Sequence, residues 1–130
     1  MLNIGGWNTQ SLGLWLDQKH VDPRTEGVLR QIIEAQNRVA DLDARLVRLE
    51  EERGRIGQEQ GRIRENLSAL GERTSEKDLR ERFVRTLNVQ EDRLEKITAE
   101  VAAATVARDS AREEVGTLLG TLDYEGAVKG

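Results

Sequence analysis

The sequence predicts an all-α fold, a long antiparallel two-helix coiled-coil hairpin with a short N-terminal capping segment. Two stretches of nearly equal length, from Pro23 to Leu70 and from Glu76 to Leu122, carry apolar residues at alternating spacings of three and four, the pattern of a coiled-coil seam. A short polar segment, residues 71–74, separates them and has the composition of a turn. Because this connection is short, antiparallel pairing within one chain costs little loop-closure entropy.

Composition and charge argue against several classes of protein. Of the 130 residues, 34% are charged and 3% are aromatic, which leaves too few large side chains to fill a globular interior. The net charge is −4 with acids and bases interspersed, so we expect no nucleic-acid binding. No apolar run is long enough to predict a membrane span. No signal peptide is visible either, which leaves the compartment open and favours the cytoplasm.

The first segment, residues 1–21, is rich in glycine and almost uncharged. It contains Trp7 and Trp15, two of the chain's few aromatic residues. A short helix is expected from about Thr9 to Gln18, with the preceding asparagine as its N-cap. We expect the segment to fold back and pack on the open end of the hairpin.

The open end, or base, of the hairpin is also a candidate interaction surface. Leu29, Ile33 and Leu119 lie there outside the regular seam, where Trp7 and Trp15 are expected to meet them. If the N-terminal segment covers these residues only in part, the base would dock on a protein partner or on a missing domain.

The first long helix is expected over about residues 23–70. Asp22 is a suitable N-cap, and Pro23 fits the first helical position, where the missing N–H costs nothing. Gly71 follows the last seam residue as a C-terminal stop. The seam of this helix consists of Val28, Ile32, Ala35, Val39, Leu42, Leu46, Leu49, Arg53, Ile56, Gln60, Ile63, Leu67 and Leu70.

The return helix is expected over about residues 76–120, with Ser75 as its N-cap. Gly120 and Gly126 weaken helix formation beyond it, so residues 22–122 are expected to form the hairpin and residues 123–130 a tail. The seam of the return helix consists of Phe83, Leu87, Gln90, Leu94, Ile97, Val101, Ala104, Arg108, Ala111, Val115, Leu118 and Leu122.

Two alignments of the seams, one heptad apart, satisfy the apolar pattern. The first places Arg53 opposite Gln90 and Leu49 opposite Leu94. It also brings opposite charges together beside the seam. Those flanking pairs are Glu52 with Arg93 and Arg45 with Glu100.

The second alignment places Gln60 opposite that same glutamine. It sets two like charges, Glu52 and Glu100, near each other, and it leaves Leu42 facing Arg108. We expect the first alignment because it avoids both conflicts.

Three glycines lie close together in the middle of the first helix. Gly54, Gly57 and Gly61 each cost about 1 kcal/mol relative to alanine in a helix. Either they are tolerated surface glycines, or a second helix or domain packs along them, as in a homo-oligomer. They share one outward stripe with Leu29, Ile33, Ala40 and Val47.

Residues suited to chemistry are scarce. His20 is the only histidine and lies between two aspartates before the first helix, a weak signal for a metal site. The turn carries Glu72, Glu76 and Asp78, which could hold Mg2+ as in transcript-cleavage factors that insert a coiled-coil tip into RNA polymerase. Basic residues are interleaved with them here. There is no nucleophilic triad and no phosphate-binding loop. We therefore expect a non-enzyme with no catalytic, cofactor-binding or metal-binding residues.

Several segments resemble the helical hairpin of bacterial mucoidy-inhibitor A-like proteins. They are the stretch from Gln60 to Leu67 with its Gln-x-Arg-x-Arg-x-Asn-Leu pattern, Leu70-Gly71, the stretch from Glu76 to Arg80, and the stretch from Gln90 to Glu95. The likeness covers roughly Leu12 to Leu122. In that family a coiled coil accompanies β-rich domains, which this sequence does not contain. The resemblance implies a bacterial helical arm whose base meets another domain, and it implies no catalytic residues.

Polar residues at and beside the seam predict one further feature. Polar side chains at seam positions commonly fix the register of a coiled coil. The arginines and the asparagine of the family-like motif lie just outside the seam, from where they could bond Gln90 or Glu91. We predict an interhelical polar layer that joins this motif to Gln90 or Arg93. Its members are Arg53, Gln60, Arg62, Arg64, Asn66, Gln90 and Arg93.

The function expected from these features is non-catalytic. The chain would serve as a structural or interaction-mediating helical arm of a larger or oligomeric bacterial assembly. The alternative is a factor that works through the hairpin tip, either a holdase-like chaperone or a regulator in the RNA-polymerase channel. Apolar residues at the tip would favour the chaperone and an all-acidic tip the polymerase factor, but the charges there are mixed.

Overall fold

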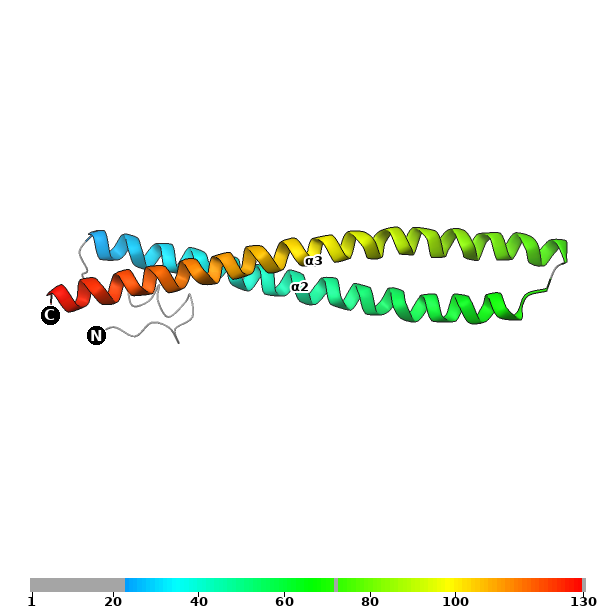
Figure 1. Cartoon of the computed structure of the whole chain (residues 1–130), viewed down its shortest axis with the longest axis horizontal. Coiled ribbons are helices and arrows are strands. Elements are labelled where there is room, and N and C mark those ends of the chain that lie inside the picture. Colours follow the sequence, from blue (N-terminus) through cyan, green and yellow to red (C-terminus); the bar gives the residue numbers. More distant parts are fainter. Residues whose placement is uncertain (1–22, 72, 130) are drawn as a thin grey trace. The chain divides into compact units, whose positions relative to one another are not determined.

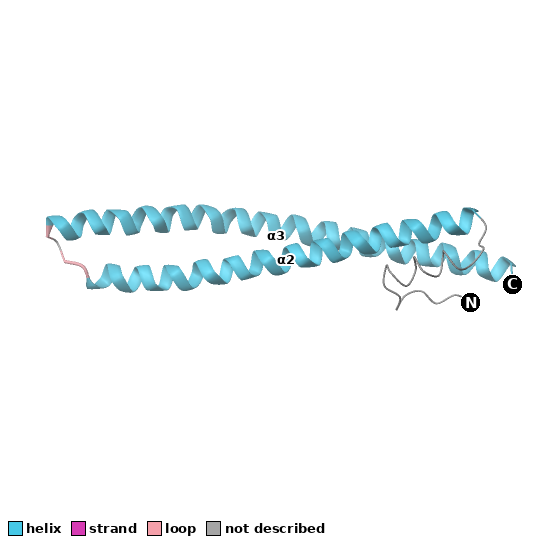
Figure 2. Ribbon diagram, turned by 180° about the vertical axis from the view of Figure 1, so that it is seen from behind, coloured by secondary structure: helices cyan, strands magenta, loops and turns pink. Residues whose placement is uncertain are grey.

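The computed structural model describes residues 23–71 and 73–129 of the chain. They form two helices, α2 (Pro23–Ala69) and α3 (Thr74–Lys129), and contain no β-strand. The helices run antiparallel and are joined by a short connection (Figures 1 and 2). The predicted all-α helical hairpin is therefore confirmed. The expected cap, residues 1–21 with Trp7 and Trp15, lies outside the described residues.

The hairpin divides into two compact units. The turn unit comprises residues 45–104 and includes the connection between the helices. The terminal unit comprises residues 1–44 and 105–130, of which 23–44 and 105–129 are described. In both units, every predicted seam residue of α2 and α3 is buried or half-buried, because the three-four spacing keeps one face of each helix against the other.

The terminal unit has the larger apolar cluster. Leu29, Ile32 and Leu122 form its centre, and the first two are completely buried. Burying a side chain of this size stabilises the fold by about 1.5–3 kcal/mol. Leu29 lies off the regular seam, so the core here is wider than a single line of residues. The residues that pack around the centre are Val28, Ile33, Val115, Leu118 and Leu119.

The core of the turn unit is narrower and partly polar. Its buried apolar residues are spaced along the seam, and Ile97 alone is completely buried. Two glutamines, Gln60 and Gln90, are buried in the same line. The other buried residues of this unit are Leu49, Ile63 and Ala104.

The connection between the helices is held by an arginine. The Arg80 guanidinium donates hydrogen bonds to the backbone carbonyls of Leu70 and Gly71, which follow directly after the last residue of α2. No described glycine has a positive φ. Gly71 therefore does not end α2 through the left-handed conformation that the sequence suggested.

The start of α3 also differs from the expectation. The Lys77 N–H donates to the Arg73 carbonyl at 2.8 Å, so Arg73, and not Ser75, occupies the N-cap position. At the turn, α3 begins beyond the end of α2 (Figures 1 and 2). The first turns of α3 thus extend past the last residue of its partner helix.

At its other end, α3 continues past the expected end near residue 120 to Lys129, so residues 123–129 of the expected tail are helical. Gly120 and Gly126 each cost about 1 kcal/mol in a helix, and the chain's only proline is far away at Pro23. Two glycines without a proline weaken a helix but do not stop it.

The contacts between the helices follow the second alignment, so the preference for the first was wrong. In the turn unit, Gln60 bonds Glu91 at 3.0 Å and Arg53 bonds Thr98 at 3.5 Å. In the terminal unit, Arg108 bonds Asp43 at 3.5 Å. In the second alignment, Gln60 lies opposite Gln90. In that alignment the two residues of each of these contacts lie opposite each other to within one position.

Arginine side chains resolve both conflicts that had argued against this alignment. Arg93 lies between Glu52 and Glu100 and bonds both of them, so the two like charges share one cation. Arg108 reaches sideways from its seam position to Asp43, which lets its stem cover the seam while Leu42 stays half-buried.

Candidate functional site

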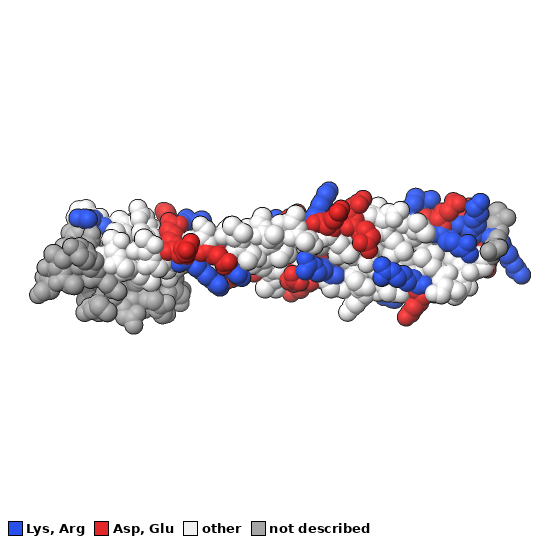
Figure 3. Space-filling model, in the orientation of Figure 1, with Lys and Arg blue, Asp and Glu red and all other residues white. Residues whose placement is uncertain are grey.

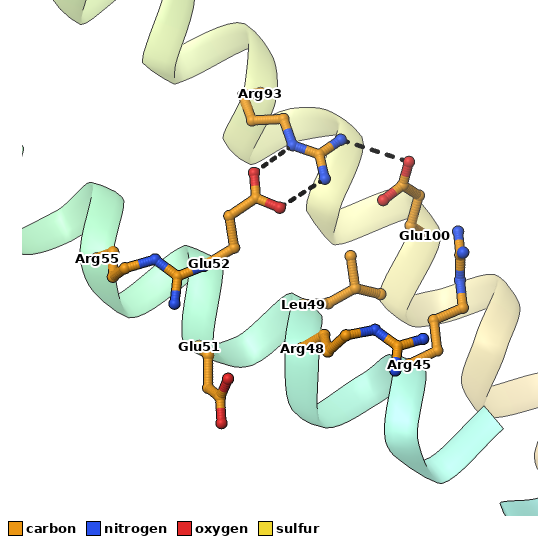
Figure 4. A pocket seen from close by; sticks show the side chains of 8 residues that line it. All are labelled: Arg45, Arg48, Leu49, Glu51, Glu52, Arg55, Arg93 and Glu100. Atoms are coloured by element: carbon orange, nitrogen blue, oxygen red, sulfur yellow. Dashed lines mark hydrogen bonds and ion pairs between the residues drawn. The ribbon is translucent and has the colours of Figure 1, made fainter. Parts of the chain in front are cut away.

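A bidentate ion pair between the two helices lies in the turn unit around Arg93. Its Nε donates to Glu52 Oε2 at 2.6 Å and its Nη2 donates to Glu52 Oε1 at 2.8 Å (Figure 4). Its Nη1 reaches Glu100 Oε1 at 3.5 Å. A guanidinium that binds a carboxylate through two parallel bonds is the strongest form of such a pair. Arg93 thus ties α2 to α3 and also braces its own helix.

This geometry fixes the charges of the pair. The hydrogen bond from Arg93 lowers the pKa of the Glu52 carboxyl below its ordinary value of 4.5. The same bond raises the pKa of the Arg93 guanidinium. Both groups hold their charges more firmly than usual, whereas a general acid or base needs a pKa near the working pH. The pair is suited to holding the helices together and poorly suited to proton transfer.

A hollow of about 500 Å³ lies beside this pair. Its lining carries both signs of charge and a single apolar side chain, Leu49. Among the described residues, no ion pair involves the arginines at positions 45, 48 and 55, and Glu51 points away from Arg93 (Figure 4). An open hollow of mixed charge does not resemble the apolar pockets that bind small molecules. Its lining residues are Arg45, Arg48, Leu49, Glu51, Glu52, Arg55, Arg93 and Glu100.

A second polar group in the turn unit surrounds the two buried glutamines. Gln60 Nε2 donates to Glu91 Oε1 at 3.0 Å, and Arg64 approaches the same oxygen at 3.8 Å. Gln90 Oε1 is buried and accepts no hydrogen bond from a described residue. An unsatisfied buried polar group costs about 1–3 kcal/mol. Gln60 and Gln90 are therefore level in the seam without being joined by a bond.

Among the described residues, no hydrogen bond or ion pair joins the Gln60–Leu67 motif to Gln90 or Arg93, the partners predicted for it. Gln60 and Arg64 instead meet Glu91, and Arg93 bonds Glu52. Arg62 and Asn66 are exposed, and no hydrogen bond joins either of them to another described side chain. Of the four polar residues that define the Gln-x-Arg-x-Arg-x-Asn-Leu pattern, two thus contact α3.

Arg53 occupies a seam position but does not bury its charge. Its guanidinium donates to Glu50 Oε1 at 3.1 Å on the same helix and to Thr98 Oγ1 at 3.5 Å on the other. The side chain is 38% exposed. The apolar stem covers the seam while the charged end reaches the solvent.

The glycine stripe of the turn unit is open. Gly54, Gly57 and Gly61 are exposed, and a Cβ atom built on each would meet nothing within 4 Å. Val47 lies on the same stripe and is 57% exposed. It borders a shallow hollow whose accessible lining is mostly apolar, formed with Leu46, Glu50 and Glu51.

The candidate residues at the base lie in the terminal unit. Leu29 is in the centre of the apolar cluster, and Ile33 and Leu119 are half-buried against it. Ile33 and Leu119 therefore expose part of their surface, and Leu29 exposes none. Trp7 and Trp15 lie outside the described residues, so the docking of these tryptophans remains a prediction.

Sequence reasoning missed three ion pairs of the terminal unit. Arg38 pairs with Glu114, and Asp43 pairs with both Arg108 and Arg112. All three join positions that flank the seams or lie in them. They become neighbours only in the second alignment, so the choice of the first alignment hid them.

The described surface carries charges of both signs. Acidic and basic side chains are interspersed on the face shown in Figure 3. The described residues contain no group of three or more His, Cys, Asp or Glu side chains placed to hold a metal ion. Within residues 23–71 and 73–129, neither helix has a stretch apolar enough to cross a lipid bilayer.

Comparison with known proteins assigns this chain to no family. No protein-family model, no curated protein and no solved structure matches this chain.

Proposed function

We propose that this protein is a non-catalytic helical arm that mediates protein–protein interaction in a larger or oligomeric assembly. The proposal rests on the open glycine stripe of the turn unit. Three glycines within eight helical residues weaken α2 by about 1 kcal/mol each, and none of them is used to pack against another part of the described chain. Close approach of another helix would give these glycines a role, because a helix face without side chains lets two backbones approach each other.

The surroundings of the stripe support a helix as the partner. Val47 exposes more than half of its surface at one end of the stripe, next to a shallow apolar hollow. Glu51 and Glu65 flank the stripe and are exposed. A partner helix with small apolar residues on its contact face and basic residues at its edges would fit this surface.

Sedimentation velocity over a wide range of protein concentration tests the homo-oligomeric form of this proposal. We expect association of the full chain that is lost when Gly54, Gly57 and Gly61 are all replaced by leucine, because the new side chains fill the space that a partner helix needs. Gly116→Leu is the matched control, since Gly116 is also exposed with open space around it but lies outside the stripe. A chain that stays monomeric at every concentration would exclude self-association through this stripe.

The resemblance to the helical hairpin of bacterial mucoidy-inhibitor A-like proteins agrees with such a role, since that hairpin accompanies other domains. It would place a further contact at the base, where Ile33 and Leu119 are half-buried. The alternative role of a factor that works through its tip is less well supported. Leu79 is 37% exposed near the tip, and charged side chains of both signs surround it in the sequence.

A further inference from the structure

One side of the turn unit gathers basic side chains from both helices. The bonds between Arg93 of α3 and Glu52 of α2 fix which sides of the two helices face the same way. Residues three or four positions from either of these two lie on that same side. They are Arg48 and Arg55 on α2, and Val89 and Lys96 on α3.

Both rows continue at intervals of seven residues. Seven residues are close to two helical turns, so residues with this spacing share one face of a helix. All of the side chains added in this way are exposed. We call the resulting surface the basic face, and it consists of Arg45, Arg48, Arg55 and Arg62 of α2 with Arg82, Val89 and Lys96 of α3.

The charges of the basic face are not neutralised within the turn unit. Among the described residues, no ion pair involves any of its arginines or its lysine, and the nearest acids, Glu52 and Glu100, are both bonded to Arg93. Glu59 is the one further acid on this side of α2. The turn unit as a whole contains equal numbers of acidic and basic residues. The excess of positive charge therefore belongs to this face and not to the unit.

The shape of the basic face suits an acidic partner. Arg45, Arg48 and Arg55 line one hollow of about 500 Å³ (Figure 4), and a guanidinium binds a carboxylate more strongly than a neutral acceptor. Val89 is 68% exposed within the same face. An apolar side chain with charged residues around it has the arrangement of a protein–protein contact.

We propose that the basic face binds an acidic α-helix of another protein, with Asp or Glu recurring at intervals of seven residues. Such a helix repeats its acids about every 10 Å, as the rows of the basic face repeat their cations. A nucleic acid fits less well, because its phosphates follow one another continuously and would meet Glu52, Glu59 and Glu100 as well as the cations. This inference does not depend on the proposed function, because the glycine stripe lies on the other side of α2.

Fluorescence anisotropy tests this inference with a labelled, alanine-rich peptide of about four heptads, long enough to form a helix, that carries Glu and Leu on one face. A matched peptide carries Gln in place of each Glu. We expect the full chain to bind the Glu peptide and to bind the Gln peptide much more weakly, because the guanidinium groups lose their charged partners.

Arg48→Gln combined with Arg55→Gln removes two cations from the hollow and is expected to weaken binding of the Glu peptide roughly tenfold. The matched control is Arg64→Gln combined with Lys77→Gln, which removes the same charge on the side of Glu91. This control should leave the affinity unchanged, and circular dichroism checks that both variants stay helical.

Three results would overturn the inference. The first is equal binding of the Glu and Gln peptides, and the second is an equal loss of affinity in the two double variants. The third is a single-stranded oligonucleotide that binds more tightly than the Glu peptide and loses affinity in the variant of the hollow. That outcome would assign the basic face to phosphates instead of carboxylates.

Discussion

Single arginines determine how charge is tolerated beside the seam of this hairpin. Arg93 neutralises Glu52 and Glu100 together, and Arg108 turns away from Leu42 to reach Asp43. Arg53 keeps its stem in the seam and its charge outside. Each of them is long enough to cover apolar surface with its stem and reach a carboxylate with its end.

Glu52→Gln is expected to lower the stability of the chain above pH 4.5, because it removes the charged partner of Arg93. In the folded chain the pKa of Glu52 lies below its ordinary value of 4.5. Its contribution is therefore fully present above pH 4.5 and is lost as the pH falls through the lowered pKa. Thermal unfolding of the wild type and the variant at several pH values measures this.

The matched control for this prediction is Glu51→Gln, which changes a neighbouring exposed carboxylate that forms no ion pair with a described residue. Its effect on the melting temperature should be small. If the difference between wild type and Glu52→Gln persists unchanged at acidic pH, the ionic contact with Arg93 is not its cause.

Gly57→Ala is expected to stabilise the monomeric chain by about 1 kcal/mol, because alanine is the better helix former. The new Cβ meets nothing within 4 Å, and the backbone has no positive φ that would favour glycine. Urea unfolding at low protein concentration measures the gain. Gly71→Ala is the contrasting variant, since Gly71 lies outside both helices, where the helix propensity of alanine brings no gain. If Gly71→Ala raised the free energy of unfolding as much as Gly57→Ala does, helix propensity would not be the cause.

At the scale of the helices, we expect the buried seam residues of α3 to contribute to the free energy of unfolding and its exposed apolar residues to contribute little. Ile97 is completely buried in the seam of α3, whereas Val89 on the same helix is 68% exposed. Ile97→Ala is expected to cost about 2–5 kcal/mol through lost burial and a cavity. Val89→Ala should change stability by no more than about 0.5 kcal/mol.

Denaturant unfolding of the two variants tests this contrast, with circular dichroism to check that helix content is kept. Equal losses would mean that Val89 is buried in solution, for example against another protein. That result would point to an interface on α3 rather than on the glycine stripe.

The helices and their seams could be predicted because they depend on the spacing of residues such as Ile32, Ile63 and Ile97, which sequence displays directly. The register could not, because it depends on where the flexible ends of Arg93 and Arg108 go. The end of α3 was missed because Gly120 costs less than the continued helix gains. For the candidate site, the sequence located the polar residues and the glycines but assigned Glu100 to Arg45 instead of Arg93.

At the scale of the whole molecule, the hairpin topology sets the order of folding. Gln60 and Glu91 are 31 residues apart in the sequence, whereas Arg38 and Glu114 are 76 apart. Closing the longer loop first costs about 0.8 kcal/mol more in chain entropy. We therefore expect pairing to begin in the turn unit and to proceed toward the chain ends.

Stopped-flow kinetics of two truncations tests this order. Ile63→Ala in the turn unit is expected mainly to slow folding, and Ile32→Ala in the terminal unit mainly to speed unfolding. Both residues are buried at seam positions, so the two variants are expected to lose similar amounts of unfolding free energy. If instead Ile63→Ala mainly speeds unfolding and Ile32→Ala mainly slows folding, folding starts in the terminal unit.

The bridge from Glu52 through Arg93 to Glu100 makes the hairpin unequally vulnerable to mutation. Loss of either acid still leaves one intact attraction, so the damage is limited. Loss of the central cation instead leaves two neighbouring anions with nothing between them, and attraction becomes repulsion in one step. Of these three residues, Arg93 is therefore the one whose substitution is expected to destabilise the hairpin most.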